Sequence, residues 1–163
     1  KTFFDVGADD IQKEFDLNMR GTWLPSKVMT PLLIGQQGAC VLNVSSMSAF
    51  TPLTRIPGYS GAKAGVSNFT QWLATYLARS GVRVNAIAPG FFMTEQNHAL
   101  QFNPDGTPTP RCAHIVDGTP MRRYGELKEL IGAMLFLVDE RAASFVTGIV
   151  LPVDGGYSAF SGV

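Results

Sequence analysis

Three stretches of this chain carry apolar residues at the three- and four-residue spacing of an amphipathic helix: 9–34, 58–79 and 126–139. Asp9 or Asp10 is expected to cap the first helix at its positive end. That helix also contains a glycine and two prolines, which predict a kink or a break within it. The third helix is expected to turn its apolar positions inward: Leu127, Leu130, Ile131, Met134, Leu135 and Val138.

Three shorter apolar runs predict strands. Residues 39–44 are apolar almost throughout, which is typical of a strand that is covered on both faces in a parallel sheet. Residues 82–88 and 148–153 are the second and third strands. Pro152 has no N–H to donate to a neighbouring strand, so the last strand should lie at the sheet edge. The pattern indicates an α/β fold with a parallel sheet covered by helices.

Composition supports a packed domain and excludes some functions. The 163 residues are enough for one domain or part of one, with 45% hydrophobic and 16% charged residues. The 13 basic and 13 acidic residues balance, and no basic stripe is present, which argues against nucleic-acid or anionic-membrane partners. Cys40 and Cys112 form no CxxC motif, and no apolar run reaches 18 residues. We therefore expect a reduced, cytoplasmic protein without a membrane span.

The stretch from about 91 to 120 follows neither period. It contains both histidines, His98 and His114, and four of the 10 prolines. A polar segment of this length is usually a functional lid or a disordered loop. A metal site built from the two histidines and Cys112 lacks tight ligand spacing, so we expect no metal.

Tyr59 and Lys63 lie four residues apart in the second predicted helix, hence on one face of it. An ammonium beside a phenol favours the phenolate, so such a tyrosine can exchange a proton with a reacting oxygen. An ordinary surface pair has the same spacing, and the chemical interpretation depends on the surrounding motifs.

Those motifs, taken in order, resemble the C-terminal two-thirds of a short-chain dehydrogenase/reductase, over almost the whole chain. They are Asn18 in Phe15-Asp16-Leu17-Asn18, Asn43-Val44-Ser45-Ser46, Tyr59-Ser60-Gly61-Ala62-Lys63-Ala64-Gly65, Arg83-Val84-Asn85-Ala86-Ile87-Ala88-Pro89-Gly90, Thr94, and Val146-Thr147-Gly148 through Val153-Asp154-Gly155-Gly156. The resemblance implies a doubly wound, Rossmann-like parallel sheet.

The resemblance also implies a catalytic set: Asn18, Ser46, Tyr59 and Lys63. Ser46, rather than Ser45, stands thirteen residues before the tyrosine, as in the family. Tyr59 would be the base that takes the hydroxyl proton, and Ser46 would donate a hydrogen bond to the reacting oxygen. Asn18 resembles the family residue that holds a water joining the lysine to solvent; a solvent-facing helix residue is the plain alternative.

A nicotinamide cofactor, NAD or NADP, is implied as well. Its expected contacts are Tyr59, Lys63, Pro89, Gly90, Phe92 and Thr94. The family begins with a strand, a glycine-rich turn and a helix that bind the pyrophosphate, and none of these precedes residue 9. We therefore interpret residues 1–163 as a single partial domain, the catalytic part of a longer enzyme. The residue that selects NAD or NADP is not in it.

Within the family, the lid and the segment after it resemble the branch that acts on sugar acids, D-mannonate oxidoreductases in particular. Expected substrate contacts are Ser46, Ser48, Arg55 and Arg111, because an arginine fork suits a carboxylate. The plain alternative pairs Arg111 with Asp105 or Asp117 on a solvated loop. A 3-oxoacyl or other ketone reductase is the second functional hypothesis, and a non-catalytic interaction protein on the same fold is the third.

The family commonly forms homo-oligomers, dimers or tetramers, through helices that match 9–34 and 58–79. Here these helices carry more apolar residues than one core face needs: Trp23, Met29, Phe69 and Trp72. We expect a homo-oligomer that binds a small-molecule substrate.

Overall fold

The computed structural model describes residues 3–162, apart from the side chain of Gln96. Three parallel strands form a sheet in the order β1 (Cys40–Val44), β2 (Arg83–Pro89), β3 (Val150–Val153). The last strand lies at an edge, as its proline predicts. Residues of β2 are buried almost throughout, but Val44 of β1 is 50% exposed. The prediction that β1 is covered on both faces is therefore only partly met, because β1 is the other edge strand of the described sheet.

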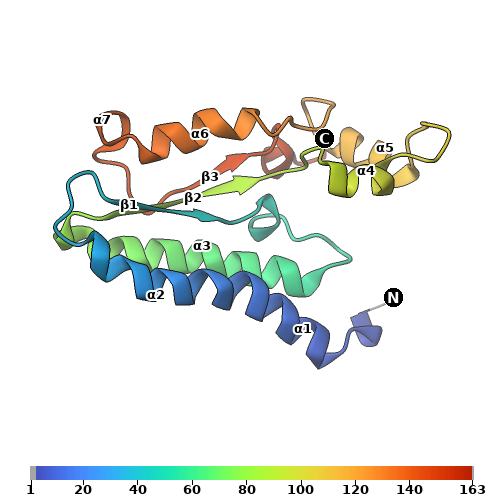
Figure 1. Cartoon of the computed structure of the whole chain (residues 1–163). Helices are drawn as coiled ribbons and strands as arrows, with labels where there is room; N and C mark the ends of the chain where they lie inside the picture. Colours follow the sequence, from blue (N-terminus) through green and yellow to red (C-terminus); the bar gives the residue numbers. More distant parts are fainter. Residues whose placement is uncertain (1–2, 163) are drawn as a thin grey trace.

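Helices cover both faces of this sheet (Figure 1). α2 (Gly21–Leu33) and α3 (Pro57–Leu77) lie on one face, and α6 (Glu129–Val138) with the short α7 (Glu140–Ala143) lies on the other. The buried core between α3 and the sheet is formed by Ala39, Phe69, Leu73, Ala74, Leu77, Val82 and Val84. Each fully buried valine, leucine or phenylalanine side chain stabilises the fold by about 1.5–3 kcal/mol.

The first helix is irregular at a different place from the one predicted. α1 (Ala8–Glu14) continues through a π-helical turn (Phe15–Arg20) into α2, which stays α-helical past Pro25 and Pro31. The N-cap of α1 is Gly7, and Asp9 and Asp10 lie in its first turn, so the predicted acidic cap is wrong. A π turn holds one extra residue per turn and often marks a functional position. The turn contains Asn18.

α6 does not bury the face that its sequence suggested. Leu137 is 1% exposed, whereas five of the six residues predicted to face inward are 39–60% exposed: Leu127, Ile131, Met134, Leu135 and Val138. This helix carries apolar residues on every side, and the described sheet of three strands covers only one stripe of it. Periodicity could therefore not identify which stripe is buried.

The polar stretch 91–120 is folded into short elements, and we keep the name lid for it. It contains two helices, α4 (Glu95–Gln101) and α5 (Pro110–Gly118), joined through a bridge between Phe102 and Pro108. Thr94 and Thr109 cap the two helices with their hydroxyls. Both helices lie beyond the carboxyl ends of the strands (Figure 1), which is where open α/β sheets bind ligands. No helix in residues 3–162 is long and apolar enough to cross a membrane.

Candidate active site

Tyr59 and Lys63 lie on one face of α3, as their spacing predicts. Pro57 occupies the first turn, where its fixed φ favours a helix start, and Tyr59 follows two residues later. The Lys63 Nζ lies 5.7 Å from the centroid of the Tyr59 ring and donates to the carbonyl of Val44 at 2.9 Å. Burial lowers the pKa of Lys63 below its ordinary 10.5. One of the three ammonium protons is thus used by β1, and two remain for other acceptors.

Ser46 is held as a hydrogen-bond donor. It caps the 3-10 turn Met47–Ala49, and its Oγ accepts from the Ser48 N–H at 3.2 Å and from the Ser48 hydroxyl at 3.0 Å. A hydroxyl has one proton and two lone pairs, so the two accepted bonds leave the Ser46 proton to donate. Ser48 is 1% exposed and its hydroxyl proton is used on Ser46, so the structure presents the Ser46 hydroxyl, and not that of Ser48, as the free donor.

Ser45 joins the end of β1 to α3. Its hydroxyl donates to the Lys63 carbonyl at 3.1 Å and lies 2.6 Å from the hydroxyl of Ser67. Ser45 is 2% exposed. These bonds bring the Ser46 turn and the Lys63 turn together at the carboxyl end of β1. This role of Ser45 was not predicted; its signal in the sequence was a second serine beside Ser46 with another serine, Ser67, one turn after Lys63.

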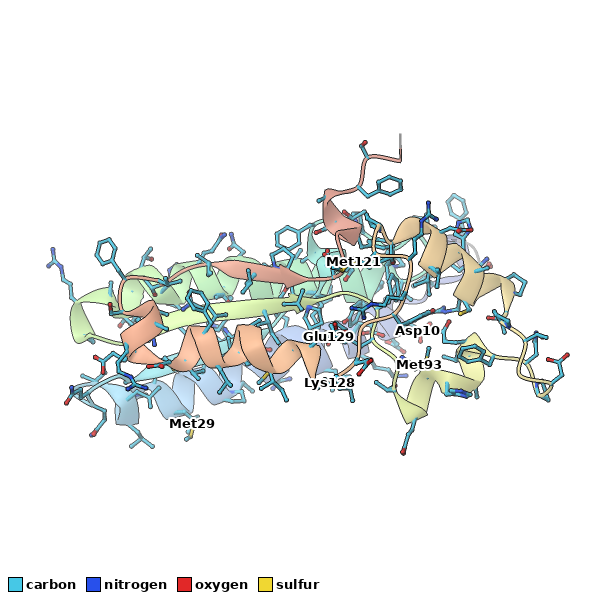
Figure 2. All side chains as sticks on the ribbon, turned by 90° about the horizontal axis from the view of Figure 1, so that it is seen from above. Asp10, Met29, Met93, Met121, Lys128 and Glu129 are labelled. Carbon is cyan, nitrogen blue, oxygen red and sulfur yellow. The ribbon has the colours of Figure 1, made fainter. Side chains whose placement is uncertain are left out.

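Asn18 and Lys63 line the same cavity, of about 490 Å³, between α2 and β1. The Asn18 side-chain amide donates to the backbone carbonyl and to the carboxylate of Glu14, both at 3.0 Å. The backbone carbonyl of Asn18 accepts from the Thr22 hydroxyl at 2.8 Å. Met29 also lines the cavity and lies at the side of the molecule in the view from above (Figure 2). The structure thus brings the predicted Asn18 and Lys63 to one space.

Gly90 has a packing role that sequence reasoning missed. A Cβ built on it would lie 2.6 Å from both the Cα and the Cβ of Asp154, and its N–H donates to the Val153 carbonyl at 2.9 Å. Only glycine allows the turn after β2 to pass this close to the turn after β3. The close approach to Asp154 is by itself enough to require a glycine at position 90, whether or not a nicotinamide lies beside it as predicted.

Thr94 connects this edge to the lid. Its hydroxyl accepts from the Asn97 N–H at 3.2 Å, and its N–H donates to the Asn97 side chain at 3.0 Å, which forms a capping box for α4. The Asn97 amide also donates to the Phe92 carbonyl at 2.8 Å. The Thr94 proton is not used in these bonds, so it can serve a further acceptor.

Arg55 and Arg111 are both exposed. The alternative partners of Arg111 are engaged elsewhere, since Asp117 pairs with Arg122 at 3.0 Å and Asp105 accepts from Thr107. Met121 and Glu129, both labelled in Figure 2, line one pocket beyond the ends of β2 and β3. Within residues 3–162, no group of three or more His, Cys, Asp or Glu could hold a metal ion.

Comparison with known proteins identifies the family. A family model described as enoyl-(acyl carrier protein) reductase matches residues 1–158. The chain belongs to the short-chain dehydrogenase/reductase family. An uncharacterized oxidoreductase of Haemophilus influenzae is 56% identical over all 163 residues, which cover 57% of that protein. A 3-oxoacyl-[acyl-carrier-protein] reductase of Synechocystis is 36% identical over 152 residues, which are 93% of this chain and 58% of the relative.

Two solved structures of this short-chain dehydrogenase/reductase family are also similar. A provisionally assigned D-mannonate oxidoreductase from Haemophilus influenzae with bound NAD has a TM-score of 0.95 and 57% identity over 99% of this chain and 58% of that one. A provisionally assigned 2-deoxy-D-gluconate 3-dehydrogenase from Agrobacterium tumefaciens with bound NADP has a TM-score of 0.85 and 30% identity over 98% and 63%. The chain thus spans a little under two thirds of each relative.

The donor groups at the sheet edge fit the nicotinamide end of such a cofactor. Lys63 has two free ammonium protons for a ribose diol, and the Thr94 hydroxyl has a free proton for an amide oxygen. The Ser46 proton is likewise free for a substrate oxygen. These groups would bind and orient the cofactor and the substrate.

Proposed function

We propose that the complete protein is an oxidoreductase that transfers a hydride between NAD or NADP and a hydroxyl or carbonyl group, with a sugar acid such as mannonate or fructuronate as substrate. The observation that carries this proposal is the shared face of Tyr59 and Lys63 beside a Ser46 whose proton is free to donate. A non-catalytic binding protein has no need of this set of groups.

The protein's own groups would handle the proton and the oxygen. The nicotinamide, when bound, accepts or supplies the hydride. In the oxidising direction, Tyr59 takes the hydroxyl proton while the Ser46 hydroxyl donates to the same oxygen and holds it in place. Lys63, with two free protons, would hold the nicotinamide ribose and keep a positive charge beside Tyr59. Thr94, Phe92 and the Pro89-Gly90 turn would border the nicotinamide.

A sugar acid fits the polar lid better than an acyl chain does. Arg111 in α5 and Arg55 before α3 are exposed, and the described structure gives neither a carboxylate partner. A charge-assisted hydrogen bond contributes roughly 1.5–3 kcal/mol, which corresponds to about ten- to a hundredfold in kcat/KM. Support also comes from the sugar-acid names of the two similar structures. The Synechocystis relative keeps a 3-oxoacyl substrate as the second hypothesis.

Steady-state assays of the complete protein test the substrate. D-Mannonate, D-gluconate and an acetoacetyl thioester are offered with each cofactor form, and we expect the acids to be preferred. Arg111→Ala or Arg55→Ala should lower kcat/KM for the acids, whereas Arg79→Ala, in the 3-10 turn after α3, should not. Preference for the thioester, or no effect of either Arg55 or Arg111, would reject the carboxylate contact. Absence of turnover with all of them would favour the non-catalytic alternative.

Residues 1–163 by themselves should not turn over. They contain no glycine-rich phosphate turn before residue 9, and the phosphate contacts are needed to position a hydride donor. Isothermal titration of residues 1–163 with NAD and NADP measures the affinity for the cofactor that these phosphate contacts provide. Micromolar affinity for either cofactor would overturn the expectation.

We also propose a cytoplasmic homo-oligomer, a dimer or a tetramer. Of the four residues expected beyond the core face, Trp23, Met29 and Trp72 are 39%, 53% and 54% exposed, whereas Phe69 is buried in the core, so that part of the expectation is wrong. Tyr76, on α3, is 69% exposed. Trp72 and Tyr76 stack with centroids 5.2 Å apart. Aromatic residues of this kind are typical of buried interfaces. Analytical ultracentrifugation that finds a monomer at high concentration would contradict this.

A further inference from the structure

A side-chain hydrogen bond of Tyr124 connects the lid to the segment that follows it, in addition to the exposed Arg122–Asp117 ion pair. The Tyr124 hydroxyl donates to the Oε1 of Gln101 at 2.7 Å, across 23 positions of sequence. Gln101 is the last residue of α4 and is only 2% exposed, although it is polar. A buried amide oxygen needs a donor, so this bond has a defined geometry and a cost if it is lost.

Gln101 lies where the two lid helices meet. The backbone carbonyl of Gln101 accepts from the Thr109 N–H at 2.8 Å. The Thr109 hydroxyl donates to the backbone carbonyl of Leu100 at 3.1 Å. The same hydroxyl caps α5 by accepting from the Cys112 N–H at 3.2 Å. A constraint on Gln101 therefore acts on α4 and α5 together.

Tyr124, by contrast, is fixed beside the chain that leaves β2. Its neighbour Gly125 donates to the Phe91 carbonyl at 2.9 Å and accepts from the Met93 N–H at 3.0 Å, which pairs this segment with the chain leaving β2. The Tyr124 ring lies edge-to-face with Phe91 at 6.4 Å between centroids. Burial, with the Cys112 thiol beside it, raises the pKa of Tyr124, so its hydroxyl stays a donor at any working pH.

We propose that Tyr124 and Gln101 form a latch that fixes α4 and α5 over the carboxyl edge of the sheet, and that Tyr124 is a positioning residue for the substrate. The substrate part of this inference rests on the proposed function. The lid carries Arg111, whereas Tyr59 and Lys63 lie on α3 and Ser46 lies in the turn after β1. Loss of the latch should therefore weaken substrate binding more than it slows the chemical step.

Hydrogen–deuterium exchange of the complete protein tests the latch without any assay of activity. Tyr124→Phe and Gln101→Met each remove one partner of the bond, and the double variant removes both. Loss of one buried hydrogen bond should speed exchange of the lid amides in 95–101 and 110–118 about fivefold, with α3 unchanged. Because both changes break the same bond, the double variant should add little to either single one.

Tyr157→Phe is the matched control. Tyr157 contacts the same Phe91 ring, at 5.2 Å between centroids, but its hydroxyl makes no hydrogen bond within residues 3–162. We expect it to leave lid exchange unchanged. Unchanged lid exchange in Tyr124→Phe, or effects of Tyr124→Phe and Gln101→Met that simply add, would overturn the latch.

Kinetics then test the positioning role. In Tyr124→Phe, KM for the sugar acid should rise about fivefold while kcat changes less than twofold. A fall in kcat with KM unchanged would reject the positioning role. If no hydroxy acid is turned over by the unmodified protein, the proposed function fails, and the exchange experiment still decides on the latch.

Discussion

The substitution Ser48→Ala isolates the orientation of the Ser46 hydroxyl. Ser48 is 1% exposed, and its hydroxyl donates to the Ser46 Oγ at 3.0 Å. Alanine removes that donor but keeps the backbone N–H, which lies 3.2 Å from the same oxygen. Ser46 therefore keeps one of its two accepted bonds, and its proton gains freedom to point elsewhere.

The magnitude follows from one neutral hydrogen bond. Its loss corresponds to about 0.5–1.5 kcal/mol, so we expect kcat to fall about three- to tenfold in Ser48→Ala. Removal of an oxyanion donor itself costs about 10²–10³ in kcat, which is the expectation for Ser46→Ala. Because Ser48 acts through Ser46, the double variant should be no slower than Ser46→Ala.

The assay is steady-state turnover of the complete protein with saturating cofactor, beside thermal unfolding of each variant. Unfolding should shift little, since no buried polar atom is left without a partner. A loss in Ser48→Ala as large as that in Ser46→Ala would mean that Ser48 contacts the substrate directly. A double variant far slower than Ser46→Ala would refute the reasoning in the same way.

Two further predictions concern stability. Gly90→Ala should destabilise the fold by about 1–3 kcal/mol in urea unfolding, because its Cβ would lie 2.6 Å from the Asp154 backbone; Gly132→Ala in α6, where a Cβ meets nothing within 4 Å, should instead stabilise by about 0.5–1 kcal/mol. Equal losses in both would reject the close-approach argument. Burial lowers the pKa of Lys63 below 10.5, so between that lowered pKa and pH 10.5 the unfolded chain binds more protons at this site. The unfolding free energy of the parent protein should thus rise relative to that of Lys63→Met as the pH increases through this window. If the difference between the two unfolding free energies stays constant across the window, the burial of a charged Lys63 is contradicted.

Sequence patterns predicted the layers of this fold and failed where one helix has apolar residues on every side. The strands, their parallel order and the edge position of β3 followed from apolar runs and one proline. The buried stripe of α6 did not, because Leu137 was one apolar residue among many. The two lid helices were also missed, since they are short and polar and their threonine caps were not recognised.

The shared helix face of Tyr59 and Lys63 was predictable from the sequence, whereas the hydrogen bonds around them were not. The spacing of Tyr59 and Lys63 is a local property of a helix, and it led directly to their shared face. The two bonds that Ser48 donates to Ser46, and the contact of Gly90 with Asp154, depend on how a turn closes in three dimensions. No periodicity or spacing contains that information.

The most direct test of the central claim is the turnover of Tyr59→Phe in the complete protein. If Tyr59 carries the proton, kcat/KM should fall by about 10²–10⁴ while thermal unfolding and cofactor binding remain near those of the parent. Tyr76→Phe, on the exposed side of the same helix, should keep full activity. Near-normal turnover in Tyr59→Phe would contradict the account, whatever the substrate proves to be.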